Sequence, residues 1–219
     1  MSQPLPQAEP VRIAGPAGQL EAVVDDPAPG RAPKAFIVVC HPHPQHGGTM
    51  TNKVVTTLAR TAHSLGVPSL RFNFRGVGAS EGAYDEGRGE IDDALATVAF
   101  GRQRWPGAAL WLAGFSFGGV VALRASTTRG VGVVDRLVTI APALGRNFGS
   151  VREVSVPGCP WLVVQGDADE VIDGALVIDW AKQLDPAPQL AVLPGVGHFF
   201  HGHLVALQAT VAGFLGAAR

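Results

Sequence analysis

The chain has 219 residues, of which 47% are hydrophobic and 16% are charged, and its formal net charge is −1. A chain of this size can bury a substantial core, and we expect one domain over residues 1–219 with a flexible segment at residues 1–10. The balanced charge argues against nucleic acid or a membrane surface as the partner, and no apolar run reaches the ~18 residues of a membrane helix. Because the N-terminus does not have the pattern of a signal peptide, we expect a cytoplasmic protein.

Apolar runs and helical patterns alternate along most of the chain. Two short antiparallel strands are expected at residues 11–14 and 20–24, before a loop rich in Pro and Gly. Further strands are predicted at 35–40, 69–74, 110–113, 136–141, 161–165 and 190–193. Helices are predicted at 51–65, around 91–98, after residue 116, at 175–184 and at 204–215. This alternation is typical of an α/β protein with a mostly parallel sheet covered by helices on both faces.

Ser116 lies between a predicted strand and a predicted helix. The run Gly114-Phe-Ser-Phe-Gly118 follows the apolar strand directly, and the helical pattern begins without a loop. A serine on so sharp a turn projects its hydroxyl from the end of the sheet, beside the N–H groups that begin the helix. We therefore interpret Ser116 as a nucleophile.

A second G-x-S-x-G sequence, residues 78–82, provides a comparison for this interpretation. No strand leads into it and no helical pattern follows it, so the context that an exposed nucleophile requires is missing. We interpret Ser80 as a solvated loop residue.

A serine nucleophile needs a base to accept its proton and an acid to orient that base. In parallel sheets such groups lie at the carboxyl ends of strands. The acidic run at residues 167–170 follows the strand at 161–165, and His198 follows the last strand. Asp173 is interpreted as a helix cap. His201 and His203 are interpreted as exposed or capping groups.

Four motifs in this order make the chain similar to the α/β-hydrolase superfamily. More narrowly, it resembles the small bacterial hydrolases without a cap that are related to dienelactone hydrolases and serine esterases. The motifs are residues 41–50 (HPHPQHGGTM), 71–82 (RFNFRGVGASEG), 114–119 (GFSFGG) and 195–202 (GVGHFFHG). The resemblance implies an eight-stranded, mostly parallel sheet and hydrolysis of esters or related acyl compounds, but it does not imply a substrate.

The resemblance also implies a role for individual residues. The family pattern selects Asp169 as the acid that orients His198, with Asp167 and Glu170 as alternatives. The backbone N–H groups of Phe117 and His43 would form the oxyanion hole. In the family a His-Gly pair usually opens the second loop, whereas here Pro42 follows His41, so Gly47 or Gly48 is the alternative donor. The His41 side chain is expected to brace the loop.

Other interpretations of these motifs are weaker. Six of the seven histidines form two clusters, 41/43/46 and 198/201/203, but their spacing is not that of a zinc site. The glycines at 76–82 miss the dinucleotide-binding pattern, and the pair Asp92-Asp93 is interpreted as part of a solvated helix face. Cys40 and Cys159 are interpreted as small buried apolar residues. We predict no cofactor and no metal.

The sequence thus predicts a serine hydrolase, in the first place a carboxylesterase that forms an acyl-enzyme on Ser116 and acts on a small-molecule ester. A thioesterase or lactonase would use the same residues. A receptor or interaction module of the same fold without catalysis is the alternative. Residues 142–160 are too few for a lid domain, so we expect an open site and short to medium acyl groups.

Overall fold

The computed structural model describes residues 8–145 and 155–217, which form an eight-stranded sheet in the order β1-β2-β4-β3-β5-β6-β7-β8. The two N-terminal strands and the pairing of β2 with β4 are antiparallel, whereas the strands from β4 to β8 are parallel. This confirms the predicted fold class. The strands are β1 (Ala8–Gly15), β2 (Gly18–Asp25), β3 (Ala35–Cys40), β4 (Ser69–Phe72), β5 (Ala109–Phe115), β6 (Arg136–Ile140), β7 (Trp161–Gly166) and β8 (Gln189–Leu193).

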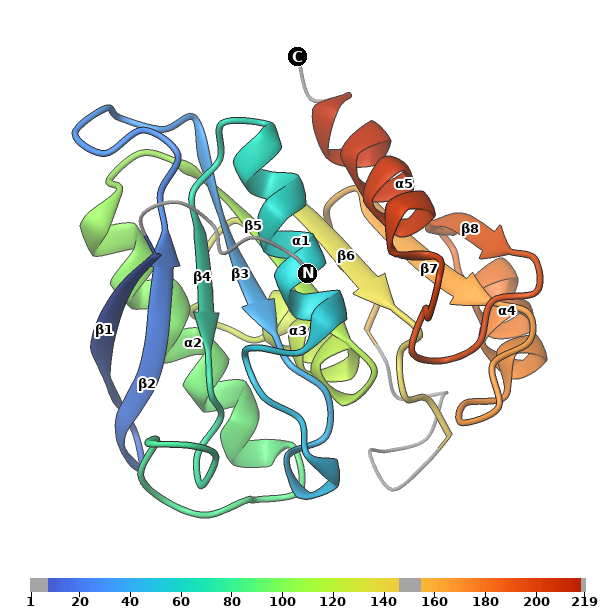
Figure 1. Ribbon diagram of the computed structural model, residues 1–219, viewed down its shortest axis with the longest axis horizontal. Coiled ribbons are helices and arrows are strands. Elements are labelled where there is room, and N and C mark those ends of the chain that lie inside the picture. Colours follow the sequence, from blue (N-terminus) through green and yellow to red (C-terminus); the bar gives the residue numbers. More distant parts are fainter. Residues whose placement is uncertain (1–7, 146–154, 218–219) are drawn as a thin grey trace.

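Helices cover both faces of the sheet (Figure 1). On one face lie α1 (Lys53–Ser64) and α5 (Leu204–Gly216). On the other lie α2 (Arg88–Arg104), α3 (Phe117–Thr127) and α4 (Gly174–Gln183). Every residue of β3 and of β7 is buried, because helices cover both faces of these strands, and this produces their continuous apolar runs. None of the helices within the described residues is long and apolar enough to cross a membrane.

The predicted elements lie within a few residues of the observed ones, with two differences. Residues 8–10, expected to be flexible, pair with the end of β2, and the rest of that predicted segment, residues 1–7, lies outside the described residues. A short 3₁₀ helix, η1 (Pro44–His46), was not predicted. No lid was expected in the connection between β6 and β7. Residues 146–154 of this connection also lie outside the described residues.

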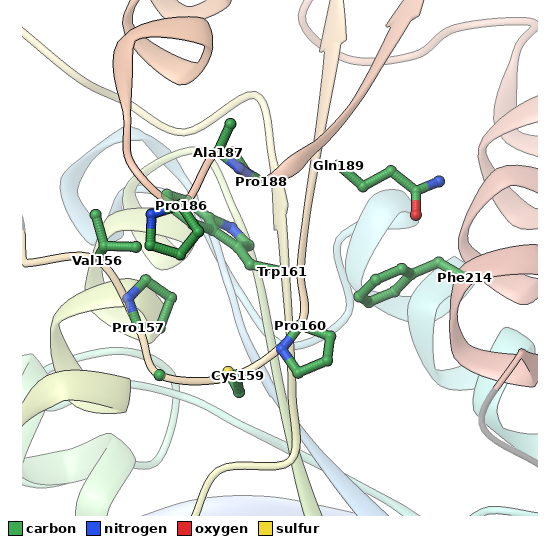
Figure 2. A pocket seen from close by; sticks show the side chains of 11 residues that line it. Val156, Pro157, Cys159, Pro160, Trp161, Pro186, Ala187, Pro188, Gln189 and Phe214 are labelled. Atoms are coloured by element: carbon green, nitrogen blue, oxygen red, sulfur yellow. The ribbon is translucent and has the colours of Figure 1, made fainter.

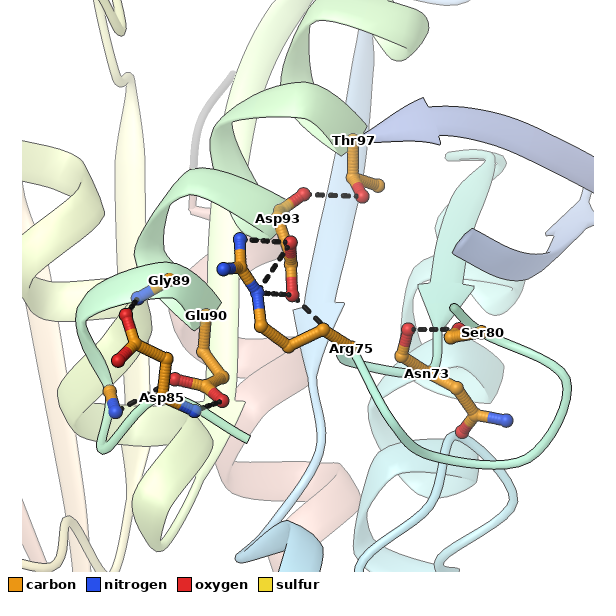
Figure 3. A network of polar contacts seen from close by, with 9 residues as sticks. Asn73, Arg75, Ser80, Asp85, Gly89, Glu90, Asp93 and Thr97 are labelled. Atoms are coloured by element: carbon orange, nitrogen blue, oxygen red, sulfur yellow. Dashed lines mark hydrogen bonds and ion pairs between the residues drawn. The ribbon is translucent and has the colours of Figure 1, made fainter. Parts of the chain in front are cut away.

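The prediction that Asp92 and Asp93 share a solvated face is wrong for Asp93. Asp92 is exposed, but Asp93 is fully buried in α2 and accepts hydrogen bonds from the Arg75 guanidinium, with Nη2 2.7 Å from Oδ1 (Figure 3). The Arg75 backbone N–H also donates to Asp93, at 2.9 Å. Paired in this way, the carboxylate can be buried, and it joins α2 to the loop after β4.

Ser80 is likewise buried, at 8% exposed, and is not solvated. Its hydroxyl donates to the Asn73 carbonyl at 2.7 Å and accepts from the Glu21 N–H at 2.9 Å. Figure 3 shows the contact with Asn73. Ser80 therefore joins its loop to β2 and to the end of β4.

A cavity of about 490 Å³ lies at the amino ends of β7 and β8, and Figure 2 shows its lining. The wall contains four prolines, Trp161 and Phe214, and no charged side chain. Cys159, predicted to be buried, is only half-buried here, and burial raises the pKa of its thiol to about 11. Cys40 is fully buried at the end of β3, as predicted.

Candidate active site

Ser116 lies between β5 and α3 with a strained backbone. Its φ is 54° and its ψ is −116°, a conformation that residues other than glycine rarely adopt. Its N–H donates to the Ile140 carbonyl at 2.8 Å, and its own carbonyl accepts from the N–H groups of Gly119 and Val120 in α3. The chain therefore passes from sheet to helix at this residue.

The two flanking glycines allow this turn by their lack of a side chain. A Cβ atom at Gly114 would collide with the Gly118 carbonyl, and a Cβ atom at Gly118 would collide with the carbonyls of Cys40 and His41. Both contacts are with backbone atoms, which cannot move aside. The first turn of α3 thus packs directly against the end of β3.

Ser116, His198 and Asp169 lie in contact although they come from three separate parts of the chain. His198 Nε2 lies 3.1 Å from Ser116 Oγ, and His198 Nδ1 lies 2.8 Å from Asp169 Oδ2. Ser116 is 7% and His198 3% exposed. Because an ionised carboxylate can only accept, Nδ1 carries the proton, and Nε2 is then able to accept one from the serine hydroxyl.

Asp169 is held in place by its own loop. Oδ1 accepts from the N–H groups of Val171 at 2.9 Å and Ile172 at 2.7 Å, and the Gln165 amide donates to Oδ2 at 3.0 Å. Burial alone would raise the pKa of Asp169. The hydrogen bonds from His198, Ile172 and Val171 outweigh that effect and lower the pKa, which favours the charged form.

The other acidic residues of this loop contact backbone atoms instead of the imidazole. Asp167 Oδ1 accepts from the Gly195 N–H at 2.6 Å, and Glu170 Oε2 accepts from the His198 N–H at 3.1 Å. They fasten the loop that carries His198, a role that the sequence did not indicate. Asp173 caps α4 by accepting from the Leu176 N–H, as predicted.

His201 and His203 are exposed, and His203 precedes α5 without a side-chain capping bond. Together with Glu170 and Phe199 they line a hollow of about 300 Å³ on the loop that carries His198. Among the described residues, no group of three or more His, Cys, Asp or Glu is arranged to hold a metal ion.

The two predicted oxyanion donors lie in neighbouring segments. Phe117 is the first residue of α3, where backbone N–H groups project from the end of the helix. The ring of His43 lies 5.2 Å from that of Phe117, centroid to centroid. Gly48, one of the alternatives to His43, already donates its N–H to the His43 carbonyl at 3.0 Å, which argues against it as an oxyanion donor.

The loop after β3 is fixed to the end of β4 by His41, which is fully buried. Its Nε2 accepts from the Phe74 N–H at 3.0 Å, so Nδ1 carries the proton and donates to the Pro42 carbonyl at 2.6 Å. Burial lowers the pKa of His41 to about 4, against a smaller opposing effect of the Pro42 carbonyl. These contacts agree with the bracing role expected for this side chain.

The far end of the same loop is held by two residues that the sequence analysis missed. The Asn73 amide oxygen accepts from the Met50 N–H at 2.8 Å, and Arg71 Nη1 donates to the Met50 carbonyl at 3.0 Å. Arg71 also forms a buried ion pair with Asp25. The alternation of polar Ser69, Arg71 and Asn73 with apolar residues along the predicted strand at 69–74 was the available signal.

Comparisons with known proteins show which family the chain is similar to. Residues 31–156 match a family model described as serine aminopeptidase, S33. An uncharacterized protein of Rickettsia prowazekii (strain Madrid E) is 31% identical over 196 residues, covering 85% of this chain and 79% of that protein. The structure is similar to that of XC6422 from Xanthomonas campestris, an α/β serine hydrolase without lid (TM-score 0.88, 41% identity, covering 98% of this chain and 97% of that one). An α/β serine hydrolase homologue from Coxiella burnetii has a TM-score of 0.85 and 40% identity, covering 93% and 95%.

Proposed function

Because the chain belongs to the α/β serine hydrolases without a lid, we propose that it is a carboxylesterase that cleaves small-molecule esters through an acyl-enzyme on Ser116. The observation that carries the proposal is the unbroken contact from Ser116 Oγ through His198 to Asp169. Ser80, the serine of the other G-x-S-x-G sequence, is engaged by Asn73 and Glu21 instead.

In the proposed reaction His198 Nε2 accepts the Ser116 proton as Oγ attacks the ester carbonyl. The negative charge that develops on the carbonyl oxygen is stabilised by the N–H groups of Phe117 and His43. The ester C–O bond then breaks, and the leaving alkoxide takes the proton from His198, which leaves the acyl group on Ser116. Water, deprotonated by His198, attacks the acyl-enzyme and releases the acid and the free serine.

An aminoacyl amide is the second substrate type to consider, because the matched family description suggests it. An enzyme that binds a free α-amino group needs a carboxylate for it. The carboxylates of the loop after β7 already accept hydrogen bonds from the protein: Asp167 from Gly195, Asp169 from His198 and Glu170 from the His198 backbone. Asp167 and Glu170 are exposed, and one hydrogen bond leaves each carboxylate further acceptor sites, so aminoacyl compounds are included in the test below.

The proposal is tested by comparing four substrate classes: p-nitrophenyl esters, acyl thioesters, lactones and aminoacyl p-nitroanilides. We expect the highest kcat/KM on esters, complete loss of activity in Ser116→Ala, and retained activity in Ser80→Ala as the matched control. A preference for thioesters or lactones would replace the substrate class but keep the mechanism. No turnover in any class, with the fold intact, would favour a receptor or interaction module.

A further inference from the structure

Gln165 is a fully buried amide next to the Ser116–His198–Asp169 group. It is the penultimate residue of β7 and is 0% exposed. Its Nε2 donates to Asp169 Oδ2 at 3.0 Å and to the Gly166 carbonyl at 3.1 Å. Both partners are acceptors only, so the NH₂ group, and not the amide oxygen, must face them.

The other end of the amide is unsatisfied. Oε1 of Gln165 is buried and finds no hydrogen-bond partner among the described residues. A buried polar atom without a partner disfavours the folded state, and an apolar side chain of the same length would avoid that cost. Among the described residues, the hydrogen bonds of this side chain are those of its NH₂ group alone.

The NH₂ group acts on the oxygen that faces the imidazole. Asp169 Oδ2 is 2.8 Å from His198 Nδ1 and 3.0 Å from Gln165 Nε2, so one oxygen is shared by two donors. Oδ1 is meanwhile held by the N–H groups of Val171 and Ile172. Two donors on one oxygen divide its negative charge, and each then binds more weakly than it would alone.

We infer that Gln165 is a positioning residue that sets how strongly Asp169 holds His198. It orients the carboxylate and moderates its attraction for the protonated imidazole, and this role rests on the proposed function of the three residues. Without the amide donor, Oδ2 would be available to His198 alone. The imidazolium would be favoured, and the serine would become reactive only at higher pH.

The test uses Gln165→Met, which keeps the length of the side chain and removes the donor. Gln165→Leu is a second variant in case the first does not fold. Thr139→Val is the matched control, because Thr139 is equally buried in the neighbouring strand β6 and bonds to Trp161, away from the triad. The rate of labelling by a fluorophosphonate is measured as a function of pH in all four proteins.

We expect the acidic limb of the labelling profile to move to higher pH by about half a unit or more in the Gln165 variants, and to stay in place in Thr139→Val. A merely structural role would lower the plateau rate without moving the limb. A limb that stays in place, or moves to lower pH, in a folded Gln165 variant overturns the inference.

A second measurement separates this inference from the proposed function. The low-field NMR signal of the proton between His198 Nδ1 and Asp169 reports that hydrogen bond whether or not the protein cleaves esters. We expect it to move further downfield in the Gln165 variants, since the oxygen is no longer shared. An unchanged signal contradicts the positioning role. A shifted signal in a protein that does not react with the fluorophosphonate would contradict only the hydrolase proposal.

Discussion

The backbone of Ser116 is strained, and this strain does not serve the packing of the core. Its positive φ costs on the order of 1–3 kcal/mol and persists because the sheet and α3 hold the residue from both sides. The nucleophile role was predicted from the strand, the glycines and the helix around it. The φ value itself could not be predicted from the sequence. Nor could the contact with His198, 82 positions away, because only the folded sheet brings the two residues together.

The three acidic residues of the loop after β7 differ in the groups that they contact. Asp169→Asn should keep the fold and lower kcat by roughly 10³–10⁴, because an amide favours the wrong tautomer of the base. Asp167→Asn retains an oxygen that accepts from Gly195 and should cost far less. Steady-state kinetics on the best ester would measure both, and the reverse ranking would mean that Asp169 is not the orienting acid.

We predict that buried His41 makes a contribution to the free energy of unfolding that is lost at acidic pH. Its pKa is about 4 when folded and about 6.5 when unfolded, so the unfolded state binds the proton first as pH falls. The stabilising contribution is complete above pH 6.5 and is lost as pH falls toward 4. Between pH 7.5 and 5 this amounts to about 2 kcal/mol.

Urea unfolding of the native protein and of His41→Gln at both pH values measures this contribution. A glutamine can accept from Phe74 and donate to Pro42 without titrating, so its stability should fall less on acidification. If both proteins lost the same free energy of unfolding, His41 would not be the group that titrates.

Among the elements, α2 shows the limit of the sequence prediction most clearly. Its apolar residues predicted the helix, but Asp93 was assigned to the wrong face. Asp93 stands four positions before buried Thr97 and eight before buried Gly101, so the helical period could have placed it inward. Its partner Arg75 could not be identified, because the pair forms across a loop that carries no periodic pattern.

The neighbouring residues Asp92 and Asp93 allow a matched test of the ion pair between Arg75 and Asp93. Asp93→Ala leaves the Arg75 guanidinium, largely buried, without its partner and should destabilise the protein by about 3 kcal/mol or more. Asp92→Ala, on the exposed side of the same turn, should change stability by less than about 0.5 kcal/mol. Thermal or urea unfolding compares them, and equal effects would show that the Arg75–Asp93 pair contributes nothing.

At the scale of the whole molecule, the parallel sheet brings the loops after β3, β5, β7 and β8 to one edge. This arrangement was predicted because strand runs and helical patterns alternate from residue 35 onward, except between the strands at 136–141 and 161–165. The anchoring of these loops was not predicted, because it depends on the hydrogen bond between Met50 and Asn73 and on that between Gly195 and Asp167. These are single contacts between polar groups that no local pattern specifies.

The chain belongs to the α/β serine hydrolases without a lid, and this predicts the acyl-length preference. A deep apolar tunnel would add about 0.8 kcal/mol of binding for each buried methylene, whereas an open site stops rewarding added carbons early. We expect kcat/KM to peak at roughly two to six acyl carbons. A series of p-nitrophenyl esters measures this, and rates that climb steadily to long chains or jump when substrate forms micelles would require a cover over the site.

The most direct test of the central claim is the site of covalent labelling by a fluorophosphonate, read by peptide mass mapping. We predict one adduct on the peptide that contains Ser116, no adduct in Ser116→Ala, and unchanged labelling in Ser80→Ala. An adduct on any other residue, or labelling that persists without the Ser116 hydroxyl, would contradict the account.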